Sequence, residues 1–444
     1  MPFRRSLAIA MPGLALAAAS HAAAQQAPAQ AGQTAATPAG PDHEQGAAGP
    51  ADETNDIVVT GTRTAGRSRL DSVSPVDVLS ATTLRQQGTT ELAAALQAVA
   101  PSIDFPRAAA VDGTDAIRPA TLRGLSPDET LVLVNGVRGH TSALLNVNGS
   151  VGRGAAAVDL NTIPTVTLDR IEVLRDGASA QYGSDAIAGV VNLRLREARS
   201  GGGAQVDYGF YDTDVDTARG SRSVKGEHAV TVSGWQGLGL GEDGFLTLSG
   251  EFLHREPTNR ADFDPRVTPT QVTGRFGDPR EEQYSLWANA GYGLGGGFRL
   301  YGWFGYTDRD TRSAAFPRLA AAATVLAGYP GGFLPIINTK SRDINSALGV
   351  KGDLGGWSVD VSASYGRNAI DFRTLNSANY AYGSATPHDF YDGKLTYDQL
   401  VGGIDVSRKF DVFKSLNVAF GVEGRRESFA IGAGELASYA TPPA

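Results

Sequence analysis

A two-residue period of apolar and polar side chains recurs through the second half of the chain, from Gly202 onward. In the stretch YSLWANAGY the apolar residues fall on one face: Tyr284, Leu286, Ala288, Ala290 and Tyr292. The stretches FRLYGWFGY and WSVDVSASY repeat this pattern. Successive side chains of a β-strand point to opposite faces, so the period predicts strands with one apolar and one polar face. Such repetition, with aromatic residues at the ends of the apolar runs, predicts an antiparallel transmembrane β-barrel over residues 201–444.

The spacing of the alternating stretches predicts nine strands, near 202–211, 225–236, 244–254, 281–294, 298–308, 346–354, 357–368, 394–410 and 416–430. Long loops are expected at 212–224, 255–280, 309–345 and 369–393, and short turns alternate with them, as in outer-membrane barrels. Such barrels have even strand numbers. Because nine is odd and the final TPPA lacks an aromatic end, we expect a truncated chain with an incomplete barrel.

Composition narrows the chemistry that the chain can perform. Its 444 residues include no cysteine, which excludes disulfides, thiolate catalysis and cysteine-ligated metals. The net charge is −8, from 39 basic and 47 acidic residues, and argues against a nucleic-acid partner. Six scattered histidines and the lack of a nucleophile-elbow motif predict no metal site, no cofactor and no enzyme activity.

The N-terminus has the organisation of a secretory signal followed by a linker. Arg4 and Arg5 precede a short apolar run, and alanines at 22–24 form a small-residue cleavage site, so residues 1–24 are predicted to be a signal peptide. Residues 25–55 consist mainly of Ala, Gln, Pro and Gly. They cannot bury enough apolar surface to offset the entropy of ordering, which predicts a flexible linker.

A short β-branched segment, DIVVTGTR at 56–63, follows the linker. Its residues Ile57, Val58 and Val59 favour a strand. On the residues alone two interpretations remain open. The segment could add as a strand to the sheet edge of a partner, or it could be the first strand of the folded domain.

Residues 64–200 have the pattern of a compact α/β domain. Ser80 is the predicted N-cap of one helix, and Thr89 or Thr90 that of a second helix, which Pro101 ends. The stretch TLVLVNGVR predicts a strand followed by an Asn-Gly hairpin turn. The stretches DRIEVLRDG and GVVNLRLRE predict further strands.

Three strings occur in this domain in a fixed order: LRG at 122–124, then TLVLVNGVR, then DRIEVLRDGASAQYGSDAIAGVVNLRLR at 169–196. Together they resemble the plug domain of TonB-dependent outer-membrane receptors. The resemblance covers residues 56–200. It implies that residues 64–200 form the plug domain and that the segment 56–63 is a TonB box. It also implies that residues 201–444 form the N-terminal part of the barrel, about nine strands of a presumed 22.

The resemblance also implies sets of working residues. One set would bind TonB by strand pairing: Asp56, Ile57, Val58, Val59 and Thr60. Arg123 and Arg175 are similar to two plug arginines that meet carboxylates of the barrel. Independently, the alternation in LNVAFGVEGRRE points Glu423 and Arg425 away from lipid. Glu423 is therefore the expected barrel partner in a latch between plug and barrel; the alternative is a carboxylate in lumen water.

The sequence gives less direct grounds for the candidate substrate-binding residues than for the sets above. The predicted loop 369–393 collects rings that could stack on a sugar or on an aromatic group of a siderophore: Tyr380, Tyr382, His388, Phe390 and Tyr391. Aromatic residues at the bases of loops also form the girdles of membrane barrels. The residues alone do not separate these two interpretations.

The resemblance implies TonB-dependent active import of a scarce solute across the outer membrane of a Gram-negative bacterium, through a multi-pass β-barrel with its plug toward the periplasm. The implied partners are TonB with the inner-membrane energising complex, outer-membrane lipid, and a small-molecule ligand or oligosaccharide. Iron–siderophore, vitamin B12 and oligosaccharide substrates all fit. The alternatives are a passive porin-like outer-membrane protein and a non-functional truncated remnant.

Overall fold

The computed structural model describes residues 57–58, 60, 67–68, 75–87, 89, 91–106, 109–147, 150–320, 329–412 and 416–441. All described residues belong to one compact unit, Ala51–Ala444. The predicted signal peptide (1–24) and linker (25–55) lie outside the described residues. In the described part of the chain, no helix is long and apolar enough to cross a membrane.

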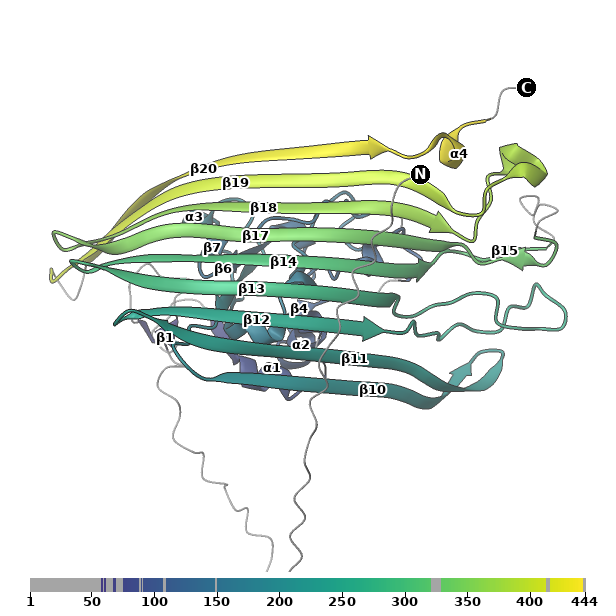
Figure 1. Ribbon diagram of the computed structural model, residues 1–444, viewed down its shortest axis with the longest axis horizontal. Coiled ribbons are helices and arrows are strands. Elements are labelled where there is room, and N and C mark those ends of the chain that lie inside the picture. The colour runs from purple at the N-terminus through teal and green to yellow at the C-terminus, as the bar shows by residue number, and fades with distance from the viewer. Residues whose placement is uncertain are drawn as a thin grey trace, which may run out of the picture. The chain divides into compact units, whose positions relative to one another are not determined.

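Within the described residues, nine long strands form one antiparallel sheet in chain order, coloured teal to yellow in Figure 1. The strands of this long sheet are β10 (Gly202–Thr217), β11 (Gly220–Leu240), β12 (Gly244–Arg255), β13 (Arg280–Gly295), β14 (Phe298–Ala314), β17 (Ile336–Leu354), β18 (Trp357–Leu375), β19 (Phe390–Phe410) and β20 (Leu416–Ala433). Their number and antiparallel order confirm the prediction made from the two-residue period.

Several strands are longer than predicted, at the ends that carry the long loops. The predicted loop 212–224 is wrong: β10 and β11 continue through it and turn only at Ala218 and Arg219. Asp212 pairs across the ladder with Lys225 there. The extension has only Val215 and Val224 as large apolar residues, so it has the hydrogen bonds of a strand without the repeated apolar period that reveals one.

The register of the long sheet separates an outward face from a face that packs on the rest of the chain. Directly paired residues of adjacent strands share a face. Leu286 and Leu348 lie on the outward face and are 65% and 61% exposed. Trp287 and Trp303 lie on the opposite, inward face and are buried. The outward face is therefore apolar although nothing in the described residues covers these two leucines.

The described residues of 75–195, which we call the plug domain, contain a five-stranded mixed sheet. Its order is β3 (Val76–Ser80), β8 (Leu168–Leu174), β9 (Gly189–Leu195), β6 (Thr130–Val134) and β7 (Val137–Arg138). Strands β6 and β9 are parallel, and the other neighbours are antiparallel. Asn135 and Gly136 have φ values of 50° and 88°, which confirms the predicted Asn-Gly hairpin turn.

The remaining elements are short. The helices are α1 (Ala81–Arg85), α2 (Leu92–Val99), α3 (Ser179–Tyr182) and α4 (Leu436–Tyr439). The paired strands are β1 (Ile57–Val58) with β2 (Arg67–Ser68), β4 (Ile103–Asp104) with β5 (Thr121–Leu122), and β15 (Arg318–Leu319) with β16 (Gly332–Phe333). The 3₁₀ turns are η3 (Thr114–Ala116), η4 (Pro127–Glu129), η5 (Leu160–Thr162), η6 (Thr165–Thr167) and η7 (Tyr380–Ala385).

The starts of the two plug helices differ in how well the sequence predicts them. Helix α1 begins after Ser80, whose hydroxyl accepts a hydrogen bond from the Thr83 N–H at 3.1 Å, as predicted. The N-cap of α2 is Glu91, and the prediction of Thr89 or Thr90 is wrong. The Glu91 side chain makes no capping bond, because its carboxylate is used by arginines of other segments.

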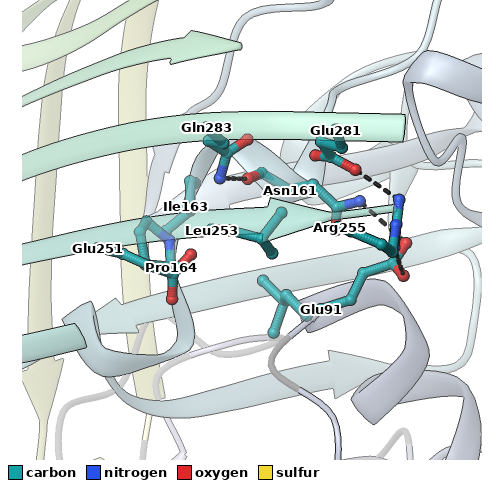
Figure 2. A pocket seen from close by; sticks show the side chains of 10 residues that line it. Glu91, Asn161, Ile163, Pro164, Glu251, Leu253, Arg255, Glu281 and Gln283 are labelled. Carbon is teal, nitrogen blue, oxygen red and sulfur yellow. Dashed lines mark hydrogen bonds and ion pairs between the residues drawn. The ribbon is translucent and has the colours of Figure 1, made fainter. Parts of the chain in front are cut away.

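The plug domain lies against the inward face of the long sheet, partly through hydrogen bonds to the turns η5 and η6. The Gln283 side chain on β13 donates to the Asn161 carbonyl at 3.1 Å (Figure 2). The Thr162 carbonyl accepts from Trp287 on β13 at 3.3 Å and from Thr307 on β14 at 2.8 Å. Neighbouring strands thus hold one turn of the plug from two sides.

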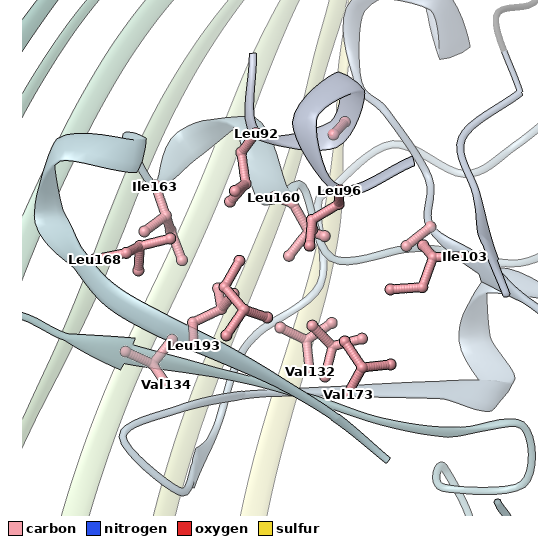
Figure 3. Packing of buried hydrophobic residues seen from close by; sticks show 14 of the residues in the cluster. Leu92, Leu96, Ile103, Val132, Val134, Leu160, Ile163, Leu168, Val173 and Leu193 are labelled. Atoms are coloured by element: carbon pink, nitrogen blue, oxygen red, sulfur yellow. The ribbon is translucent and has the colours of Figure 1, made fainter. Parts of the chain in front are cut away.

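The interior of the plug domain is an apolar core. Leu92 and Leu96 of α2 face Val132, Val173 and Leu193 of the plug sheet across this core (Figure 3). These side chains are at most 2% exposed. Each large aliphatic side chain buried in this way contributes about 1.5–3 kcal/mol.

Candidate functional site

The segment predicted to bind TonB is only partly described. Asp56 and Val59 lie outside the described residues, and the backbone of Ile57 and Val58 pairs with Ser68 and Arg67. The structure therefore places a short strand here, and its partner is a strand of the same chain.

Thr60 ties this segment to the plug sheet. It is buried, and both its N–H and its hydroxyl donate to Glu172 Oε2, at 2.9 and 2.6 Å. The Asn192 side chain donates to the Thr60 hydroxyl at 2.9 Å. Glu172 on β8 and Asn192 on β9 are themselves buried, so these bonds lie in a low-dielectric setting where their loss is costly.

A cluster of buried ion pairs joins the plug domain to the long sheet. Glu91 pairs with Arg118 at 2.6 Å and with Arg255 of β12 at 3.2 Å. Arg118 also pairs with Asp278 at 2.7 Å. Arg255 also pairs with Glu281 of β13 at 2.5 Å (Figure 2). Each arginine therefore bridges two carboxylates, one from the plug and one from the sheet side of the interface.

Arg309 of β14 extends the cluster toward the middle of the plug. It contacts Asp159 directly and lies 3.8 Å from Glu281. Its side chain is 2% exposed, as is that of Asp159. Charges buried this deeply are stable only while they remain paired, so this contact fixes where the plug meets β14.

A second contact joins the plug to β17 and β18. His140 Nε2 lies 3.3 Å from the Asp343 carboxylate, and Asn368 donates to the other oxygen of Asp343 at 2.9 Å. Asn368 also accepts from the Ala143 N–H at 2.8 Å. The His140 ring lies directly against Gly366, where a Cβ atom would overlap the ring, so glycine permits this close approach.

Two plug residues in these contacts have shifted pKa values. Burial lowers the pKa of His140, but the Asp343 carboxylate more than reverses this, so its pKa lies above the ordinary histidine value. Burial likewise opposes the charge on Arg118, and Glu91 and Asp278 raise its pKa above the ordinary arginine value. In both cases neighbouring carboxylates favour the charged form of the side chain: Asp343 and Asp278 from the side of the long sheet, and Glu91 from the plug itself.

These buried contacts leave little empty space between plug and sheet. The cavity among Glu91, Asn161, Arg255, Glu281 and Gln283 has a volume of about 10 Å³ (Figure 2). That is close to the minimum for one water molecule. This cavity is therefore too small for a solute larger than a water molecule.

The residues predicted to form the latch are not all brought together. Glu423 and Arg425 face the plug, but Glu423 lies 3.4 Å from Arg138, and Arg425 pairs with Asp185 at 3.1 Å. Arg138 also pairs with Asp185, at 2.5 Å, so four side chains form one group.

Arg123 and Arg175 do not approach Glu423 in this structure. Arg123 is 54% exposed and lies 3.8 Å from Asp176, and Arg175 pairs with Asp77 at 3.0 Å. Both arginines thus have carboxylate partners within the plug domain. The expected pairing of these two with Glu423 is corrected to Arg138, which projects from the short edge strand β7.

The five aromatic and imidazole candidates for substrate binding do not form one surface. Tyr380 and Tyr382 lie in η7, and His388 meets the ring of Tyr329 edge-on at 4.7 Å. Phe390 is buried at the start of β19. The Tyr391 hydroxyl donates to Asp371 at 3.0 Å, on the outward side of the sheet.

Sequence reasoning missed the residues that carry most of the interface charge, namely Arg118, Arg255, Glu281 and Arg309. The sequence contains a signal for three of them. Arg255, Glu281 and Arg309 occupy inward positions in strands whose apolar and polar residues alternate. The residue types alone do not say whether such a position meets lumen water or a buried partner. Among the described residues, no group of three or more His, Cys, Asp or Glu side chains could hold a metal ion.

Comparison with known proteins identifies the first domain. The family described as TonB-dependent Receptor Plug Domain matches residues 68–190. The vitamin B12 transporter BtuB of Vibrio cholerae serotype O1 is 32% identical over 122 residues, which cover 28% of this chain and 18% of that protein. The corresponding transporter of Photobacterium profundum is 33% identical over 142 residues, covering 30% and 20%.

Solved structures extend the likeness in fold to the long sheet. A ferric enterobactin receptor of Pseudomonas aeruginosa, in complex with enterobactin, superposes with a TM-score of 0.55 at 15% identity. The siderophore receptor PirA of Acinetobacter baumannii gives a TM-score of 0.54 at 16% identity. The matches cover 81% and 80% of this chain, but only 50% and 48% of those receptors. The chain therefore contains a TonB-dependent receptor plug domain at residues 68–190, and its fold is similar to that of these receptors over about half of their length.

Proposed function

We propose that this chain works in TonB-dependent import of a scarce solute across the outer membrane of a Gram-negative bacterium. The observation that carries the proposal is a plug domain held by buried ion pairs against the inward face of a sheet whose outward face is apolar. An apolar outward face suits a strand that crosses lipid, and a charged inward face suits a plug that water can reach when it moves.

The orientation follows from the links between strands. Adjacent strands are joined by tight turns at one end, such as Gly355 and Gly356 between β17 and β18. At the other end they are joined by long loops, except for the two-residue turn between β10 and β11. Short turns face the periplasm in outer-membrane barrels. We therefore assign the long loops to the cell exterior and the plug, residues 64–200 in the predicted boundaries, to the periplasmic side.

The segment Asp56–Thr60 is the proposed TonB-binding site. TonB would pair with it as an added strand, taking the place of β2 beside Ile57 and Val58. The bonds of Thr60 to Glu172 and Asn192 support this assignment, because they hold the segment on the plug until a pull or a plug movement breaks them. Force on the segment is then transmitted to β8 and β9.

For the transported solute we propose only a chemical class. Relatives of this chain are named for vitamin B12, and neighbours in fold for ferric enterobactin and other siderophores. An iron–siderophore, vitamin B12 or an oligosaccharide therefore fits the proposal, without covalent chemistry. Tyr380 and Tyr382 in η7, on the exterior side, remain candidate contacts for it.

The latch remains a proposal in revised form. Glu423 and Arg425 on β20, with Arg138 and Asp185 of the plug, form a group that would have to separate if this side of the plug moved. Arg123 and Arg175 lie at the exposed surface of the plug, and a role for them would require a different plug position.

The test is deletion of Ile57–Val59 in the native protein, with uptake of labelled vitamin B12 and ferric enterobactin measured in cells that depend on it. Uptake of the transported probe should fall to background while binding at the cell surface is unchanged. A deletion of three residues inside 25–55 is the matched control and should leave uptake unchanged. Uptake that survives the deletion, and that survives dissipation of the proton gradient, would instead identify a passive porin-like protein.

A further inference from the structure

The connection between β12 and β13, residues 256–279, has internal hydrogen bonds that join its two arms. The Thr258 N–H donates to the Asp278 carbonyl at 3.0 Å, and the Arg260 N–H donates to the Phe276 carbonyl at 2.7 Å. We call this connection the paired loop. Because its arms are bonded to each other along their length, a displacement of one arm carries the other with it.

The paired loop is also fastened to the long extension of β10 and β11. The Glu227 carboxylate of β11 accepts a hydrogen bond from the Asn259 N–H at 2.7 Å and pairs with Arg260 at 2.7 Å. Arg219, in the turn between β10 and β11, pairs with Asp262 near the tip of the loop at 2.6 Å. The loop and this hairpin therefore support each other, at the end of the sheet that we assign to the cell exterior.

The base of the paired loop contacts the plug through Asp278. Its carboxylate lies 2.7 Å from Arg118, whose other partner is Glu91 at 2.6 Å. The side chain of Arg118 is 4% exposed, and those of Glu91 and Asp278 are 9% and 13% exposed. Glu91 is the residue at which helix α2 begins, and its carbonyl accepts from the Ala95 N–H at 3.0 Å. One buried guanidinium thus joins the start of a plug helix to an exterior loop.

We propose that Asp278 and Arg118 are positioning residues that couple the paired loop to the plug. If the loop moved away with Asp278, the buried Arg118 would keep only one carboxylate, which is costly for a charge in this setting. The docked plug would then be held less tightly. By linkage the effect is reciprocal, so that release of the plug would also loosen the loop. The inference rests on the proposed function only for the event that it regulates, which is plug release.

The experiment measures hydrogen exchange by mass spectrometry on the full-length protein purified in detergent. Asp278→Asn, a change in the loop, should make exchange in helix α2 of the plug about tenfold faster. Arg118→Gln, a change in the plug, should accelerate exchange in the paired loop by a similar factor, at the amides of Thr258 and Arg260. The double variant should exceed neither single variant, because all three proteins lack the same bridge. Asp278→Glu keeps the charge and should restore slow exchange in α2.

The matched control is Asp262→Asn, which removes the same charge from the same loop but breaks its pair with Arg219 of the hairpin. It should accelerate exchange near the tip of the loop and leave α2 unchanged. The proposal would be overturned if Asp278→Asn affected the loop alone, if Arg118→Gln affected the plug alone, or if Asp262→Asn accelerated α2 equally. Exchange in detergent requires neither TonB nor a solute, so a failure here leaves the uptake result of the Ile57–Val59 deletion to be judged separately.

Discussion

The interior of the plug domain and its interface with the long sheet are held by different forces. The interior is apolar, with Leu96 and Leu193 buried among other aliphatic side chains (Figure 3). The interface is ionic, with Arg118, Arg255 and Arg309 each between carboxylates. The core of the plug domain is therefore stabilised by apolar packing, and its contact with the long sheet by ion pairs.

This difference determines whether the core of the plug or its interface with the long sheet separates more easily. Apolar side chains lose their whole contribution when water enters, so the core of the plug resists separation. Paired charges that separate completely into water regain their hydration, which offsets much of the lost attraction. A plug built in this way can leave the sheet as a unit, or in part, while its own core stays folded. Active transport past a plug requires such a separable contact.

The largest effect is expected at Arg309. Arg309→Ala leaves Asp159 buried without its direct partner, and loss of one partner from a buried ion pair costs about 3–5 kcal/mol. The cost should fall on docking: hydrogen exchange at 159–163 should become much faster, while exchange in β8 and β9 changes little. Mass spectrometry of the purified protein in detergent would measure both regions.

The control for this prediction replaces both partners. Arg309→Met/Asp159→Asn removes the charges and keeps most of the volume, so docking should recover by more than half, since a neutral pair has no uncompensated charge. If hydrogen exchange became equally faster throughout the plug in Arg309→Ala, this would contradict the view that core and interface are stabilised independently.

A smaller effect is expected in the core, where faster hydrogen exchange should appear in the plug sheet and not at the interface. Leu193→Ala removes a fully buried side chain from β9 and should destabilise the plug domain by about 3 kcal/mol. Exchange should rise across β8, β9 and β6 together, because one core supports all three strands. Val206→Ala, at an exposed position of β10, is the control and should leave plug exchange unchanged. Faster exchange confined to 159–163 in Leu193→Ala would mean that core and interface are not independent.

The long sheet and its strand order could be predicted from the sequence because alternation with period two is a local signal. This signal fails where β10 and β11 extend through 212–224, because the stretch has too few apolar side chains to alternate and its pattern does not differ from that of a loop. The helix start at Ser80 was predictable because the cap is a short-range hydrogen bond.

The interface was predictable only in part, because its contacts join residues far apart in the chain. Alternation placed Glu423 and Arg425 on the inward face, and both do meet the plug. It could not identify Arg138 as the partner, since that depends on how β7 lies against β20 in the folded protein. For the same reason, Glu91 has the local position of a helix cap but is used by Arg118 and Arg255.

The smallest and most reversible effect is expected at His140, which meets Asp343 of β17 and is also influenced by Asp159. Its pKa is raised in the folded protein, so protonation stabilises the docked plug. This contribution is complete below the unfolded value of about 6.5 and is lost as the pH rises through the higher folded value. Protease sensitivity of the plug should therefore increase as the pH rises above about 6.5 and through the higher folded-state pKa. His140→Gln keeps a polar side chain but does not titrate, so it should flatten this pH dependence; an unchanged profile in the variant would place the titrating group elsewhere.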